Sequence, residues 1–182
     1  MSVISHKFRN YQPSKYTETL FLGIFIPDHS EVDFFYGRSR NFFWHLLPKC
    51  WGMESMLDSP LSGKQQIIAS HQIDFADLIE ALDVPEGEED NSDDTFIDSH
   101  VEQWKDIIGL IDSLPNLKNV YFTRKTFNNI PRIRIQVTSI SKHCKEKGIR
   151  ICKLETPARF FSEEKQQQWI DTIILQKSCL RV

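Results

Sequence analysis

The segment from Thr19 to Leu47 contains the residue types in this 182-residue chain that best suit a chemical site. An apolar run ends at Pro27 and leads into a polar turn. Beyond the turn, two aromatic clusters enclose a glycine, two arginines and an asparagine: Phe34, Phe35, Tyr36, Gly37, Arg38, Arg40, Asn41, Phe42, Phe43 and Trp44. Aromatic faces stack on flat rings, and a carboxamide both donates and accepts hydrogen bonds at a ring edge. The segment therefore predicts a pocket for a nucleobase.

A second polar turn, residues 155–159, precedes the last predicted helix. It contains Thr156, Pro157 and Arg159. Backbone amides and the helix dipole favour phosphate groups at such a position. Ligands of parallel sheets bind beyond the carboxyl ends of the strands. Because both turns directly follow predicted strands, we expect them to share one cleft.

The elements that must position these turns alternate between strands and helices. Three short apolar segments are predicted strands: residues 20–26, 119–123 and 149–154. Gly23 interrupts the first of them, which indicates a close approach by another backbone or a ligand. The order of elements predicts an α/β fold with three layers, α/β/α, around a short and mostly parallel sheet of about four strands.

Capping residues and apolar spacing predict the helices. They comprise residues 39–47, capped by Ser39 and ended by Pro48; 64–70; 75–82, capped by Asp74; 99–111, opened by the capping box Ser99 to Glu102; and a last helix capped by Ser162. The segment 133–140 fits either a strand or a helix. Gly148 is expected to end the helix that precedes the third strand.

Charge is distributed unevenly along the chain, whose formal net charge is −3. Six of the nine residues in 86–94 are acidic, and without them the chain has 22 cationic and 19 (25 − 6) acidic residues. We expect residues 83–95 to form an exposed, flexible insertion in a single domain that spans residues 1–182. The remaining charge balance neither excludes DNA as a partner nor argues for it.

Cysteine spacing and hydropathy bear on compartment and cofactors. The four cysteines lie far apart with no CxxC pair, which predicts free thiols and no metal site. No segment approaches the roughly 20 apolar residues that span a membrane, and the first residues lack the apolar core of a signal peptide. We therefore expect a soluble, cytoplasmic protein that needs no metal or organic cofactor.

Two motif regions resemble the uracil-DNA glycosylase superfamily. The first is Gly23-x-Phe25-x-Pro27 followed by Tyr36-x-x-x-Arg40-Asn41-x-Phe43-Trp44, and the second is Leu154 to Arg159 followed by a helix with Trp169. The likeness is greatest to the mismatch-specific uracil and hypoxanthine-DNA glycosylase branches. The resemblance implies an α/β fold and DNA as the partner. It also implies base flipping and hydrolysis of the N-glycosidic bond of a deaminated base, hypoxanthine or uracil, in DNA repair.

The resemblance implies that Asn41 is catalytic and orients the attacking water. Asp28 is the second candidate, because it is the acid directly after Pro27 in the first turn. The residues expected to bind the base are Gly23, Phe25, Pro27, Phe35, Tyr36 and Phe42. Those expected to contact DNA are Arg38, Arg40, Thr156, Pro157 and Arg159, with Arg159 as a wedge or a phosphate contact.

Structural alternatives exist for these assignments. Phe43 and Trp44 are expected to pack in the core, and Asn41 can instead stabilise the loop before its helix. The chain departs from the family pattern at Asp28, where glycine is usual, and at Glu155, where a small hydroxyl residue is usual. An alternative function is therefore a catalytically inactive module on the same fold that binds nucleic acid or a free nucleobase.

Overall fold

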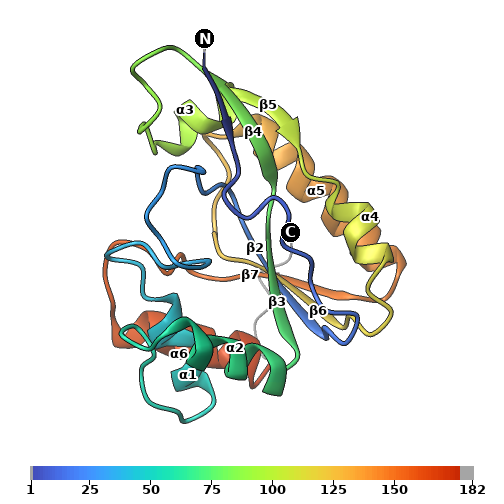
Figure 1. Cartoon of the computed structure of the whole chain (residues 1–182). Coiled ribbons are helices and arrows are strands. Elements are labelled where there is room, and N and C mark those ends of the chain that lie inside the picture. Colours follow the sequence, from blue (N-terminus) through green and yellow to red (C-terminus); the bar gives the residue numbers. More distant parts are fainter. Residues whose placement is uncertain (1, 177–182) are drawn as a thin grey trace.

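A four-stranded parallel sheet with the order β3-β2-β6-β7 forms the centre of the computed structural model, which describes residues 2–176 (Figure 1). Its strands are β2 (Thr19–Gly23), β3 (Ile73–Asp77), β6 (Asn119–Phe122) and β7 (Arg150–Lys153). The strands predicted at 20–26, 119–123 and 149–154 are confirmed, although β2 ends at Gly23. As the continuous apolar run indicates, β2 is an interior strand that pairs with both β3 and β6.

Helices cover both faces of this sheet, which confirms the three-layer α/β fold. Side chains alternate along β2, so Phe21 enters one apolar cluster while Leu20 and Leu22 enter the other. Helices α1 (Phe43–Cys50), α2 (Leu61–Ser70) and α6 (Glu163–Ile173) cover the Phe21 face. Helices α4 (Ile107–Asp112) and α5 (Pro131–Glu146) cover the opposite face (Figure 1).

A small antiparallel sheet, order β1-β4-β5, was not predicted. It consists of β1 (Ser2–Ser5), β4 (Ile79–Val84) and β5 (Val101–Trp104), and α3 (Asp94–Ser99) precedes β5. The predicted helix 75–82 is therefore wrong, since it covers the end of β3 and most of β4. Asp74 caps no helix; its carboxylate accepts hydrogen bonds from the Tyr11 and Thr17 hydroxyls and the Ser14 amide.

The predicted helix 99–111 is also wrong, because strand β5 occupies its first half. Helix α4 begins only after Asp106, whose Oδ1 accepts a hydrogen bond from the Gly109 amide at 2.8 Å. Helix α1 begins at Phe43, not at Ser39, and contains Pro48. A proline inside a helix leaves the carbonyl four residues earlier without its donor. Here the Met56 amide donates to that carbonyl, of Trp44, at 2.7 Å.

The remaining helix predictions agree with the structure. Helix α2 contains the predicted segment 64–70, and the ambiguous segment 133–140 lies in α5. Ser162 caps α6, because its hydroxyl accepts a hydrogen bond from the Lys165 amide at 3.2 Å. Gly148 follows the end of α5 with a φ of +71°, a conformation that glycine adopts without strain.

Membrane-spanning helices and metal sites were searched for in residues 2–176. None of the helices in this part of the chain is long and apolar enough to cross a membrane. Nor does this part contain a group of three or more His, Cys, Asp or Glu side chains that could hold a metal ion. Cys50 and Cys144 are free thiols, as predicted, whereas Cys152 is disulfide-bonded, which corrects the prediction of free thiols throughout.

Candidate functional site

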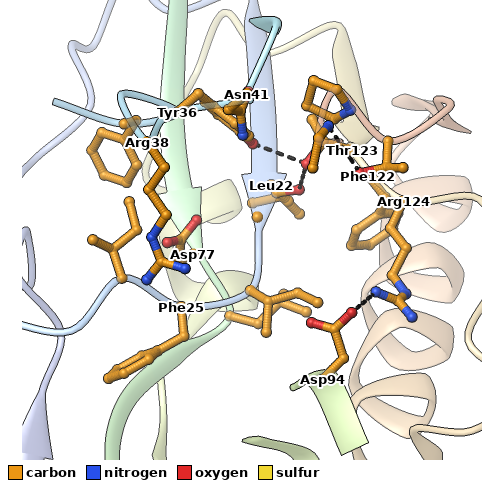
Figure 2. A pocket seen from close by; sticks show the side chains of 18 of the residues that line it. Leu22, Phe25, Tyr36, Arg38, Asn41, Asp77, Asp94, Phe122, Thr123 and Arg124 are labelled. Atoms are coloured by element: carbon orange, nitrogen blue, oxygen red, sulfur yellow. Dashed lines mark hydrogen bonds and ion pairs between the residues drawn. The ribbon is translucent and has the colours of Figure 1, made fainter. Parts of the chain in front are cut away.

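A cavity of about 600 Å³ opens at the carboxyl ends of the four parallel strands (Figure 2). Gly23 and Asp77 are the last residues of β2 and β3, and both line it. Thr123 and Glu155, which follow β6 and β7, line it as well. The cavity therefore lies where an open parallel sheet usually binds its ligand, beyond the strand ends.

The two predicted turns meet at this cavity through backbone contacts. Asn41 and Ala158 form an isolated antiparallel bridge. Next to it, the Phe42 amide donates a hydrogen bond to the Pro157 carbonyl at 2.8 Å. The expectation that both turns share one cleft is confirmed, and the hydrogen bonds make them a single wall.

Two arginines on this wall have left-handed backbone conformations, which cost energy for residues other than glycine. The φ angles are +59° at Arg40 and +79° at Arg159. The Arg159 amide donates a hydrogen bond to the Arg40 carbonyl at 2.8 Å, so the two strained residues face each other across the junction. Strain of this kind is typical of functional loops and is maintained here by the hydrogen bonds between the turns.

Most of the predicted site residues are brought together. Those lining the main cavity are Gly23, Phe25, Phe35, Tyr36, Arg38, Asn41, Thr156, Pro157 and Arg159. Pro27 lines an adjoining cavity of about 260 Å³, which shares Phe25 and Arg38 with the main one.

Three predicted residues, Asp28, Arg40 and Phe42, line neither cavity. The Asp28 side chain is 54% exposed, and its backbone amide donates to the Ser5 carbonyl. The Phe42 ring lies near Phe161, with 6.4 Å between the ring centroids. The second candidate for water activation thus lies outside the cavity in this structure.

Asn41 stands at the junction of the two turns and faces the cavity (Figure 2). Its Oδ1 accepts a hydrogen bond from the Phe43 amide at 3.1 Å, which stabilises the start of α1. Its NH₂ group has no hydrogen-bond partner within residues 2–176. A carboxamide oxygen has two lone pairs, so Asn41 retains one acceptor position and two donors for a ligand.

Tyr36 supplies both a flat face and a hydroxyl. Its ring stacks on Phe43 with 4.1 Å between centroids and an angle of 11° between the planes. Its hydroxyl is 3.1 Å from that of Thr123 (Figure 2). Desolvation by burial, and then the charge of Asp77, raise the pKa of Tyr36, so its hydroxyl stays protonated. Phe43 and Trp44 are fully buried packing residues, as expected.

Asp77 is a cavity residue that the sequence did not reveal. Its carboxylate is 5% exposed, and Oδ2 lies 2.8 Å from Nε2 of His6, which is also buried. The wrong helix prediction for 75–82 concealed that Asp77 ends a strand. An apolar strand that ends in a carboxylate beside the first turn would have been the signal.

Ion pairs surround the mouth of the cavity. Arg124 pairs with Asp94, and Lys125 pairs with Glu155. Figure 2 shows Arg38 and Asp77 on one side of the cavity and the Arg124–Asp94 pair on the other. Asp94 ends the acidic segment, most of whose residues are exposed, but the ends of the predicted insertion 83–95 belong to β4 and α3. Through Asp94, that segment reaches the cavity and pairs with Arg124 there.

A buried lysine stabilises the second turn. Lys165 is 6% exposed, and its Nζ donates hydrogen bonds to the carbonyls of Ala158, at 3.2 Å, and Phe160, at 2.7 Å. Burial lowers the pKa of Lys165. Because Ala158 also bridges to Asn41, Lys165 supports both turns at their junction.

Comparison with known proteins gives one informative match. No family model matches the chain, and no curated protein matches it significantly. The fold is similar to the solution NMR structure of a "putative Uracil DNA glycosylase" from Methanosarcina acetivorans. The TM-score is 0.59 with 21% sequence identity, and the match covers 86% of this chain and 89% of the other. At this identity the match shows that the fold resembles that structure.

Proposed function

We propose that this protein is a DNA glycosylase that hydrolyses the N-glycosidic bond of a deaminated base, hypoxanthine or uracil. The observation that carries the proposal is the convergence of two hydrogen-bonded turns on one cavity that contains aromatic faces and uncommitted polar groups. A glycosylase must extrude its base from the helix and hold it between flat side chains while contacting its polar edge. The similarity of fold to a protein described as a "putative Uracil DNA glycosylase" supports the same function. The motif residues resemble those of the mismatch-specific uracil and hypoxanthine-DNA glycosylase branches.

In this proposal Asn41 positions the reacting water. The free lone pair of Oδ1 accepts a hydrogen bond from water, whose oxygen attacks C1′ of the deoxyribose. The bond between C1′ and the base nitrogen breaks, and its electron pair leaves with the base, which then takes up a proton. The aromatic rings that line the cavity supply the stacking surface for the extruded base, at a contribution of about 1–3 kcal/mol per stacked base.

The test is release of the base from oligonucleotides that each carry one uracil, hypoxanthine, xanthine or mismatched base. We expect an abasic site with hypoxanthine or uracil, and a loss of about 10²-fold or more in the single-turnover rate for Asn41→Ala, as for a lost water-positioning group. Asn41→Asp separates the acceptor from the NH₂ donors, because the carboxylate still accepts from the Phe43 amide and from water; we expect it to keep the base release that Asn41→Ala loses. Asn116→Ala is a matched control, since Asn116 is exposed before the amino end of β6. Absence of base release from every substrate would contradict the proposal.

Two observations favour the second candidate function, a binding module without catalysis. Asn41 already has a structural role through the Phe43 amide, and Asp28 lies outside the cavity. Such a module would bind DNA with a strong dependence on salt, because phosphate contacts release counterions, but would leave the base attached. DNA binding without base release selects this function.

A further inference from the structure

The Asp77 carboxylate has one oxygen committed to the protein and one directed to the cavity. Oδ2 is held by His6 at 2.8 Å, whereas Oδ1 has no hydrogen-bond partner within residues 2–176. Oδ1 lies against the backbone of Gly23, since a Cβ added there would approach it more closely than 3.0 Å. Because glycine has no side chain, Asp77 Oδ1 can lie against the backbone of Gly23 at the cavity wall.

The hydrogen bonds of His6 define which of its two ring nitrogens carries the proton. Its Nδ1 is 3.0 Å from the Phe8 amide, which can only donate, so Nδ1 carries no proton. The ring proton is then on Nε2 and is donated to Asp77 Oδ2. Asp77 consequently presents an acceptor, and no donor, to a ligand in the cavity.

A hydroxyl lies beside this acceptor. The Tyr36 hydroxyl is 3.4 Å from the same Cβ position at Gly23. Either hydroxyl can be the donor between Tyr36 and Thr123. When Thr123 donates to Tyr36, its hydroxyl releases the Leu22 carbonyl, which keeps the Thr123 amide as a donor at 3.1 Å. Tyr36 can then donate its own proton into the cavity. The site therefore combines an acceptor with a neighbouring donor.

We infer that Asp77, oriented by His6, recognises the ring N–H of a lactam base, while Tyr36 donates to the adjacent carbonyl. The inference rests on the proposed glycosylase function and specifies its substrate class. Deamination converts N1 of adenine or N3 of cytosine from an acceptor into an N–H donor, and the adjacent amino group into a carbonyl. A carboxylate oxygen opposite that nitrogen accepts from the deaminated base and repels the lone pair of the parent base.

The first experiment needs no variant. Single-turnover release of hypoxanthine is compared with that of N1-methylhypoxanthine, and release of uracil with that of N3-methyluracil. Methylation removes the N–H and keeps the carbonyl, so we expect the methylated bases to be released at least about 100-fold more slowly. In Asp77→Ala the absolute rates fall, but the ratio between each base and its methylated form approaches one, because the variant has both lost the acceptor and gained room.

The second experiment tests the orientation that His6 imposes. In Asp77→Asn the carboxamide oxygen must face the Nε2–H of His6, so the NH₂ group faces the cavity. We expect this variant to release hypoxanthine and uracil about 100-fold more slowly and to lose discrimination against adenine and cytosine. Adding His6→Ala frees the carboxamide to rotate, which restores part of the preference for the lactam bases. A merely structural role for His6 predicts no such recovery.

The outcomes separate this inference from the proposed function. Release of hypoxanthine or uracil together with equal release of the methylated bases would overturn the inference and leave the glycosylase proposal intact. Unchanged base preference in Asp77→Asn would overturn it as well. If the native protein releases neither base, both proposals fail together.

Discussion

Replacement of Gly23 by alanine tests the contact on which the cavity depends. A Cβ at this position would lie closer than 3.0 Å to Asp77 Oδ1, 3.3 Å from its Cγ and 3.4 Å from the Tyr36 hydroxyl. Asp77 cannot swing aside without losing its 2.8 Å hydrogen bond to His6, and both side chains are buried. The substitution must therefore move either the carboxylate or the end of β2.

The expected magnitude combines opposing terms. Alanine in a strand is favoured over glycine by about 0.5–1 kcal/mol, because glycine loses more conformational freedom on folding. Overpacking costs about 1–3 kcal/mol, and loss of a hydrogen bond to a charged group adds about 1.5–3 kcal/mol. Gly23→Ala should therefore lower the free energy of unfolding by about 1.5–5.5 kcal/mol.

Urea denaturation of matched variants measures this effect. Gly63→Ala in α2 is the control, because its Cβ would meet only Met56 Cε at 3.4 Å and Ser59 Cβ at 3.8 Å. It should stabilise the protein by about 0.5–1 kcal/mol. In an Asp77→Ala background the colliding atoms are absent, so the cost of Gly23→Ala should fall below about 1 kcal/mol. An equal cost in both backgrounds would refute the collision as the cause.

Two further predictions concern charge. Asp94→Asn removes the partner of Arg124 at the cavity mouth, so binding to undamaged DNA should tighten, and the slope of log K against log salt should become steeper by about 0.9 for one added phosphate contact. Fluorescence anisotropy at several salt concentrations measures this, and an unchanged slope would contradict it. Burial raises the pKa of the Cys50 thiol from 9.0 to about 12. The folded protein therefore keeps a proton that the unfolded chain loses, and stability falls as pH rises through the window from about 9 to 12. In denaturation experiments, the free energy of unfolding of Cys50→Ala should decrease less steeply with pH across this range. An identical decrease in both proteins would show that other groups cause the pH dependence.

The sequence predicted strands well where apolar residues form short runs bounded by glycine or proline. It failed at residues 73–84, where Phe75, Leu78, Ile79 and Leu82 have the i, i+3, i+4, i+7 spacing of a helix. Two tertiary features produce that spacing in strands. All residues of β3 are buried, so no alternation marks it, and the pairing of β4 with β5 shifts register near Ala81. Neither feature can be deduced from the local pattern.

The sequence predicted those site residues that lie in turns directly after recognisable strands. Asn41 and Thr156 lie in turns directly linked to recognisable strands or helices, and both line the cavity. Asp77 and His6 could not be found in this way. Asp77 was assigned to a helix, and His6 reaches the site from beyond the end of β1, whose pairing with β4 depends on long-range contacts. The assignment of Asp28 rested on proximity in sequence, which does not measure distance in space.

The bridge between Asn41 and Ala158 links the proposed chemistry to the proposed contact with DNA. Asn41 belongs to the turn proposed to hold the base, and Ala158 belongs to the turn proposed to contact the DNA backbone. The buried Lys165 donates a hydrogen bond to the Ala158 carbonyl, and Arg40 and Arg159, one in each turn, have left-handed backbone conformations beside the bridge. A force on the second turn is therefore transmitted to the carboxamide of Asn41 by backbone hydrogen bonds, without rearrangement of side chains. If the proposed function holds, binding of the DNA backbone and positioning of the reacting water are thus coupled through this junction.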